Sequence, residues 1–223
     1  MQFRHEVKHE ISESDMLILR QRLRAVMKPD AHAVNGRYEI RSLYFDNLDD
    51  KALREKLNGV SIRKKYRIRM YNNDPSVIHL ERKFKNGGLG CKTSAGLTPG
   101  QAKAIAGGDV DWMADSTDEV IFGFYTRIRT EGLKAKVIVD YTREPFVFGP
   151  GNVRVTLDYG IRTGMSCTDF LNPACVTVPV MGSPCILEVK WDNYLPDVIR
   201  DAVQLEGRRS TAFSKYAACR MYD

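Results

Sequence analysis

The sequence has no long hydrophobic run, no paired cysteines and no histidine cluster, and each absence argues against one class of protein. No stretch approaches the roughly 18 consecutive apolar residues that a membrane-spanning helix needs. The N-terminus, MQFRHEVKHEIS, lacks the apolar centre of a signal peptide. The five cysteines are scattered without a CxxC pair, and the four histidines have no metal-ligand spacing. We therefore expect a cytoplasmic protein with reduced thiols, no membrane span and no zinc site.

Internal repeats, low-complexity tracts and linkers are also absent, so we expect a single domain over residues 1–223. A hydrophobic content of 43% in 223 residues is ample for a packed core. The formal net charge of +6 favours anionic partners.

The positive charge is concentrated in one stretch, residues 61–92. This stretch holds nine lysines and arginines against two acidic residues, so its net charge of +7 exceeds the +6 of the whole chain. A turn sequence, Asn72–Pro75, divides it into two predicted strands of a hairpin. The first strand alternates cationic and apolar side chains, which predicts one cationic and one apolar face. The alternating residues are Lys65, Tyr66, Arg67, Ile68, Arg69 and Met70.

Periodicity and capping signals predict the other elements. Alternation with a period of two indicates strands, and apolar spacing of three and four indicates helices. Capping boxes at 12–15 and 116–119 mark two helix starts. The predicted strands are 3–11, 38–46, 65–70, 77–84, 91–95, 134–148, 152–161 and 185–191. The predicted helices are 16–27, 49–57, 99–107, 120–131, 196–205 and 211–222. The hairpin order of the strands predicts a mostly antiparallel α+β fold.

Charged or polar side chains recur on one face of strand after strand. On an open sheet this face would only be solvated, whereas a closed barrel would turn it into the lining of a basic tunnel. Such a lining is costly unless an anion and a metal neutralise it. The paired positions are Glu6 and Lys8, Arg67 and Arg69, Glu81 and Lys83, Tyr141 and Arg143, Arg154 and Asp158, and Glu188 and Lys190.

Eight short motifs give the chain a family resemblance. It resembles the VTC domain, the polyphosphate-polymerase branch of the triphosphate tunnel metalloenzymes, or CYTH superfamily. The motifs follow the family order and span essentially the whole chain. They are SLYFDN (42–47), YRIRMY (66–71), LERK (80–83), CKTS (91–94), DYTREPF (140–146), VRVTLD (153–158), LEVK (187–190) and FSKY (213–216).

The resemblance implies a closed eight-stranded antiparallel β-barrel with flanking helices, a tunnel that binds a triphosphate or polyphosphate with Mn²⁺ or Mg²⁺. The implied reaction transfers the γ-phosphate of ATP to inorganic polyphosphate. Glu188 is the implied principal metal ligand, with Glu6 and Glu81 as further ligands, and Lys215 and Glu188 are the implied catalytic residues. One departure is the first strand, RHEVK, which lacks the first glutamate of the superfamily's ExExK. The implied phosphate ligands are Lys8, Arg67, Arg69, Lys83, Lys92, Tyr141, Arg143, Arg154 and Lys190.

Several alternatives stay open at this point. Water in place of the acceptor phosphate would make the same site a triphosphatase, and the basic hairpin alone could serve a non-enzymatic polyphosphate or RNA binder. We expect no nucleic-acid partner, because RNA binding favours exposed aromatic rings among the basic residues. A membrane-protein partner is compatible with the family. Four arginines are expected to be structural or on the surface: Arg41, Arg63, Arg127 and Arg129.

Overall fold

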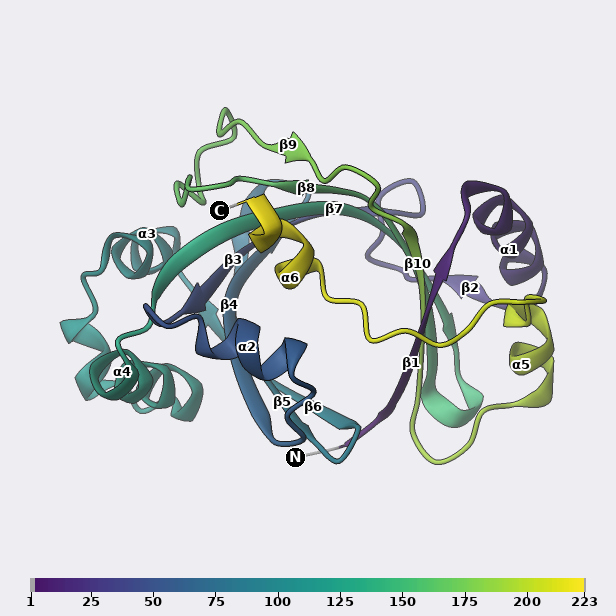
Figure 1. Cartoon of the computed structure of the whole chain (residues 1–223), viewed down its shortest axis with the longest axis horizontal. Coiled ribbons are helices and arrows are strands. Elements are labelled where there is room, and N and C mark those ends of the chain that lie inside the picture. Colours follow the sequence, from purple (N-terminus) through teal and green to yellow (C-terminus); the bar gives the residue numbers. More distant parts are fainter. Residues whose placement is uncertain (1–2, 223) are drawn as a thin grey trace.

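The computed structural model describes residues 3–222. Its α+β fold is built on one strongly curled antiparallel sheet, in the order β1-β10-β8-β7-β3-β4-β5-β6 (Figure 1). Two-residue strands β2 (Lys28–Pro29) and β9 (Val178–Pro179), which the sequence did not predict, extend the sheet off this path. The eight main strands are β1 (His5–Ile11), β3 (Tyr38–Asp46), β4 (Arg63–Tyr71), β5 (Asp74–Asn86), β6 (Leu89–Leu97), β7 (Lys134–Phe148), β8 (Val153–Thr163) and β10 (Cys185–Trp191).

The two ends of this sheet, β1 and β6, meet at one point. The amide of Arg4 donates to the carbonyl of Gly90 at 3.1 Å, and the amide of Gly90 donates back to Arg4 at 3.3 Å. Further along β1, the amide of Thr211 donates to the carbonyl of Lys8 at 2.8 Å. The curl is therefore nearly closed, with one bridge across the seam and a C-terminal segment along the edge of β1. This confirms the predicted eight-stranded antiparallel tunnel fold.

Six helices surround the sheet within the described residues. They are α1 (Glu13–Val26), α2 (Lys51–Leu57), α3 (Pro99–Gly107), α4 (Glu119–Glu131), α5 (Asp197–Val203) and α6 (Lys215–Cys219). The helices α1, α3, α4 and α5 lie outside the curl, whereas α2 and α6 lie on its inner side (Figure 1). The inner face of the sheet is therefore the face toward α2 and α6.

Local capping explains most helix boundaries. Ser12 and Asp15 form the predicted capping box of α1, and Thr98 caps α3. The predicted box at 116–119 is wrong in detail, because Asp118, not Ser116, accepts the first amides of α4. The predicted helix 211–222 is also wrong in extent. It is reduced to α6 and a short 3₁₀ turn, Arg220–Tyr222, because the chain before Lys215 runs beside β1.

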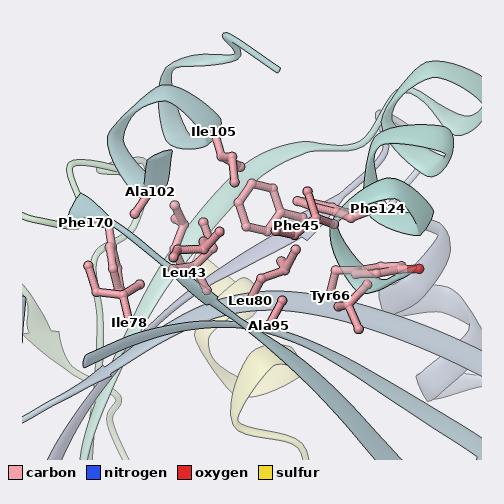
Figure 2. Packing of buried hydrophobic residues seen from close by; sticks show 14 of the residues in the cluster. Leu43, Phe45, Tyr66, Ile78, Leu80, Ala95, Ala102, Ile105, Phe124 and Phe170 are labelled. Atoms are coloured by element: carbon pink, nitrogen blue, oxygen red, sulfur yellow. The ribbon is translucent and has the colours of Figure 1, made fainter. Parts of the chain in front are cut away.

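The outer face of the sheet is apolar, as the alternation in β4 predicts. Tyr66, Ile68 and Met70 are buried in a cluster between the sheet and helices α3 and α4. Tyr66 stacks on Phe124 of α4 with ring centroids 4.8 Å apart, and Figure 2 shows Phe45 beside them. A second cluster, which includes Leu19, Leu23 and Val155, packs α1 and α5 against the strands β8 and β10. These two clusters leave the opposite strand face to line the tunnel.

Candidate active site

Strand register brings opposite charges together on the inner face. In the β1–β10 ladder Lys8 lies across from Glu188, and Glu6 across from Lys190. In β4–β5 Arg67 lies across from Glu81, and in β7–β8 Arg143 lies across from Asp158. Directly opposed side chains of a sheet are close enough to pair. We call the resulting set the tunnel cluster. Its members are Glu6, Lys8, Lys65, Arg67, Arg69, Glu81, Lys83, Lys85, Lys92, Arg143, Asp158, Glu188, Lys190 and Lys215.

The carboxylates Glu6 and Glu188 share two lysines. Lys8 Nζ lies 3.1 Å from Glu188 Oε2 and 3.6 Å from Glu6 Oε1. Lys190 Nζ lies 2.5 Å from Glu188 Oε1 and 3.7 Å from Glu6 Oε2. Lys83 adds a contact of 2.9 Å to Glu6. This arrangement places two carboxylates beside each other in a ring of ammonium groups.

Both carboxylates are ionised despite their burial. Burial raises the pKa of Glu188, but Lys190 and Lys8 lower it more, so the net pKa lies well below its ordinary value. Burial likewise raises the pKa of Glu6, and Lys83 and the other lysines bring it below its ordinary value. The proximity of Glu188 opposes the ionisation of Glu6. The two carboxylates therefore present negatively charged oxygens side by side, and the neighbouring lysines offset the repulsion between them.

Glu81 forms a separate group with arginines of β4. Arg67 Nη2 lies 2.6 Å and Arg69 Nη1 3.8 Å from its Oε2, and Lys92 Nζ lies 2.7 Å from its Oε1. Arg69 also donates to Ser42 Oγ at 3.0 Å and to the hydroxyl of Tyr141 at 3.1 Å. Glu81 shares none of its ion-pair partners with Glu6 or Glu188. Its observed contacts orient guanidinium groups.

Asp158 holds the cations from β7 and from the C-terminal helix. Arg143 Nε donates to its Oδ1 at 2.6 Å, and Lys215 Nζ lies 2.6 Å from its Oδ2. Lys215 also lies 4.5 Å from the ring centroid of Tyr141. Asp158 is completely buried, and the four carboxylates of the cluster are 6% exposed or less. The sequence pattern placed Asp158 with Arg154 on the charged face expected to line the tunnel, but gave it no binding or catalytic role.

Lys65 differs from the other cations of the cluster because no carboxylate pairs with it in the described structure. Its Nζ lies 4.9 Å from the ring centroid of Tyr44 and 4.8 Å from that of Tyr216. Burial lowers its pKa to about 8, and Arg67 and Lys8 add to this effect. Tyr44 accepts a hydrogen bond from Arg67 at 2.8 Å. Burial raises the pKa of Tyr44, but Arg67, Lys65 and Arg69 bring it down to about 7.

All the predicted site residues lie on the inner face, and all but one contact one another there. The exception is Arg154, which stands across from Lys190 but pairs with Asp30 at 3.2 Å. The structure adds Lys65, Lys85, Asp158 and Tyr44. The alternation with Arg67 and Arg69 already placed Lys65 on this face, but no local signal marked Tyr44.

Three of the four arginines set aside as structural pair with carboxylates away from the tunnel cluster. Arg41 binds Asp140 at 2.9 Å, Arg127 pairs with Glu131, and Arg129 pairs with Asp111. Arg63 instead donates to the carbonyl of Val60.

Residues 3–222 contain no helix long and apolar enough to cross a membrane. They also contain no group of three or more His, Cys, Asp or Glu side chains placed to hold a metal ion. A divalent cation at Glu6 and Glu188 would therefore take its remaining ligands from elsewhere.

Comparisons with known proteins place this geometry in a family. A search of curated protein sequences found no match. A Bacillus halodurans structure described as a candidate adenylate cyclase is 15% identical, with a TM-score of 0.50 over 85% of this chain and 80% of that one. At this identity the likeness shows a shared fold alone. A conserved hypothetical protein from Pyrococcus furiosus, 13% identical over 90% of this chain and 85% of that one, has a TM-score of 0.47, too low to support an argument.

The family profile is decisive because it spans the tunnel strands and the terminal helix together. The profile of the VTC domain matches residues 3–222. The chain therefore belongs to the VTC domain family.

Proposed function

We propose that the tunnel is the active site of a metal-dependent polyphosphate polymerase, which transfers the γ-phosphate of ATP to a growing inorganic polyphosphate chain. The observation that carries this proposal is the composition of the tunnel cluster, in which ten cations surround four carboxylates. This excess of positive charge is suited to a multiply charged anion. The VTC family includes polyphosphate polymerase domains, which agrees with this choice.

The arginines supply directional contacts to phosphate oxygens. Guanidinium groups bind phosphate with two parallel N–H donors and remain charged at all relevant pH values. Glu81 and Asp158 hold Arg67 and Arg143 in fixed orientations. Groups that are oriented before substrate binds need no reorganisation during the reaction. We therefore assign Arg67, Arg69 and Arg143 to triphosphate binding, with Glu81 as a positioning residue rather than a metal ligand.

Glu6 and Glu188 fit a hard divalent cation, Mn²⁺ or Mg²⁺. Both present ionised carboxylate oxygens, and these metals commonly combine one or two carboxylates with substrate phosphates and waters. When bound, the metal would neutralise charge on the transferred phosphoryl group and its leaving oxygen. Lys8 and Lys190, which now neutralise the two carboxylates, would then be free to turn toward phosphate oxygens.

Phosphoryl transfer requires alignment and charge neutralisation more than covalent participation of the protein. Lys215 lies between Asp158 and the ring of Tyr141, at the first residue of α6. We assign this ammonium to the transferred phosphate. Helices α2 and α6 cover the inner side of the sheet, which limits the access of water as a competing acceptor (Figure 1).

Buried carboxylates distinguish this site from a passive polyanion binder. Four ionised carboxylates inside a binding groove would weaken the attraction for phosphate, and each is costly to desolvate. A catalytic site that holds a metal and orients arginines has a use for them. This argument favours an enzyme over a non-enzymatic binder of polyphosphate or RNA.

The test is the fate of labelled phosphate. The protein is incubated with ATP labelled at the γ-phosphate and with Mn²⁺ or Mg²⁺, and the products are separated on a gel. We expect label in chains of increasing length, with one ADP released for each phosphate added. Label in free phosphate alone would show a triphosphatase, and unchanged ATP under both metals would show a binder.

A further inference from the structure

Three cations gather where β4 enters the sheet beside α2, at one mouth of the tunnel. They are Lys56, Arg63 and Lys65, and we call them the mouth row. None of the three forms an ion pair with a carboxylate in the part of the chain that the structure describes. Every other cation of the tunnel cluster has such a partner. The positive charge of these three side chains is therefore not neutralised by a direct ion pair.

Lys65 connects the mouth row to the tunnel. Its ammonium lies over Tyr44, the residue that accepts a hydrogen bond from Arg67. The same lysine and Arg63 also line a cavity of about 210 Å³ between α2, α4 and the start of β4, to which Asp46, Glu55 and Glu131 contribute carboxylates. Lys65 therefore stands between the tunnel arginines and the two other cations of the mouth row.

The mouth row is electrostatically unfavourable in the free protein. Burial lowers the pKa of Lys56, and Arg63, Lys8 and Lys85 lower it further. The pKa of Lys65 is lowered by burial and by Arg67, Lys8 and Lys56, and Tyr44 opposes this shift. An anion bound along the row would relieve this repulsion, because a nearby opposite charge stabilises the charged form of each side chain.

We propose that the mouth row is an additional polyanion-binding site, which holds the part of an inorganic polyphosphate chain that extends beyond the reaction site. The inference rests on the proposed function for the identity of the polymer. It assigns to the row a task that ATP does not need, because the triphosphate site proposed above is formed by the tunnel arginines. The row therefore favours a chain of many phosphates over a short one.

The rings at this mouth argue against a nucleic acid as the occupant. Single-stranded nucleic acid binds through bases stacked on exposed aromatic rings. Here Lys65 covers Tyr44 and Tyr216. The available groups are ammonium and guanidinium, which bind phosphate without reading a base.

The test compares long-chain polyphosphate with tripolyphosphate in equilibrium binding at fixed ionic strength. The variant is Lys56→Gln combined with Arg63→Gln, which removes two charges from partly exposed positions. We expect its affinity for long-chain polyphosphate to fall roughly tenfold or more, with a shallower dependence on salt, because fewer counterions are released. Affinity for tripolyphosphate should stay within about twofold, because exposed charges away from the ligand contribute little.

The matched control is Arg54→Gln, which removes an exposed cation from the same helix outside the mouth row. It should leave both affinities unchanged, and a Lys56→Arg single variant should retain long-chain binding. Equal losses for both ligands, or no loss for either, would overturn the inference. A greater loss for single-stranded RNA than for polyphosphate would overturn it too. The measurement needs no turnover, so a protein that makes no polyphosphate but shows this difference would refute only the proposed function.

Discussion

Glu188 is the residue on which the assignment of the metal depends most. Its carboxylate oxygens lie 2.5 Å from Lys190 Nζ and 3.1 Å from Lys8 Nζ, and it lies beside Glu6 in the same ring of cations. A glutamine has the same shape but no negative charge. The substitution therefore separates the electrostatic role of this side chain from its packing.

We expect Glu188→Gln to abolish metal-dependent turnover, with a loss of roughly a hundredfold or more, since a metal ligand and a buried charge are removed together. Thermal unfolding should still be cooperative, because Lys8 and Lys190 keep Glu6 as a partner. The matched control is Glu144→Gln, which removes a buried carboxylate that pairs with Arg20 on the outer face. Turnover by Glu188→Gln at the wild-type rate would remove this residue from the site.

Arg67 and Arg63 belong to the same strand but to different parts of the tunnel. Arg67→Ala removes a guanidinium that Glu81 orients, so we expect triphosphate affinity to fall by about 1.5–3 kcal/mol. Arg63→Ala should change it by less than about 0.5 kcal/mol, the usual range for a group away from the ligand. Titration calorimetry with tripolyphosphate measures both. Equal effects would mean that the inner face of β4 does not line a phosphate site.

Tyr44 gives the tunnel a pH dependence near neutrality. Its pKa of about 7 means that the phenol is neutral below pH 7 and anionic above it. A phenolate beside Arg67 repels phosphate and neutralises its guanidinium. Lys65, with a pKa of about 8, loses its positive charge somewhat higher. Both changes act in the same direction and weaken anion binding as pH rises.

We therefore expect tripolyphosphate affinity to decrease steadily between about pH 6 and about pH 9. Tyr44→Phe should remove the part of this decrease that the phenol causes and leave only the part due to Lys65, shifted to lower pH because Tyr44 raises the pKa of that lysine. Tyr159→Phe is the control, since this phenol binds Glu144 outside the tunnel and burial raises its pKa to about 12. A Tyr44→Phe profile that superimposes on the wild type would refute the role of this phenol.

Among the elements, strands were predicted better than the contacts between them. The bounds of β3, β7 and β10 agree with the predicted strands 38–46, 134–148 and 185–191, because these segments are rich in β-branched and aromatic residues and are flanked by glycine, proline or asparagine. The cationic face of β4 was also predicted correctly. The ion-pair partners were not, because they depend on register between strands that are far apart in sequence. Glu81 illustrates this, since no local signal marked its ion pairs with Arg67, Arg69 and Lys92.

The C-terminal helix was overestimated for a related reason. Its apolar and aromatic residues suit a helix from 211 onward, but the segment before Lys215 forms hydrogen bonds to β1. Such a long-range contact has no local signal. The consequence is functional, because this segment carries Lys215 onto the inner face.

Helix α6 is linked to α2 through a buried hydrogen bond and through Arg220, which binds Asp50 at the start of α2 at 2.8 Å. The hydroxyl of Tyr216 donates to Asp46 at 2.8 Å, and the same carboxylate accepts the amides of Ala52 and Leu53 in α2. Both helices cover the inner side of the tunnel. Loss of this hydroxyl should therefore affect their stability together.

We expect Tyr216→Phe to destabilise the protein by about 1–2 kcal/mol, the usual cost of a lost hydrogen bond to a buried charged group. Hydrogen exchange should increase in α2 as well as in α6, because Asp46 links them. Tyr194→Phe, at an exposed position, should change neither quantity. Faster exchange confined to α6 would contradict the coupling of the two helices.

At the scale of the whole molecule, the sheet separates two kinds of surface. Its outer face is covered by helices through apolar clusters, and its inner face collects the titratable groups of seven strands and one helix. A near-closed curl of this kind concentrates positive potential in an enclosed space, where it is screened less than on an open surface. The enclosure also explains why a basic hairpin alone does not account for the site. The carboxylates come from strands at both ends of the chain.

We propose that this enclosed space binds a triphosphate together with a divalent metal at Glu6 and Glu188. The decisive experiment is a crystal structure with a non-hydrolysable ATP analogue and Mn²⁺. We predict an anomalous manganese peak in contact with Glu188 and Glu6, with the triphosphate inside the curl against Arg67, Arg69 and Arg143. A triphosphate bound outside the sheet, or manganese at other residues, would rule out this site.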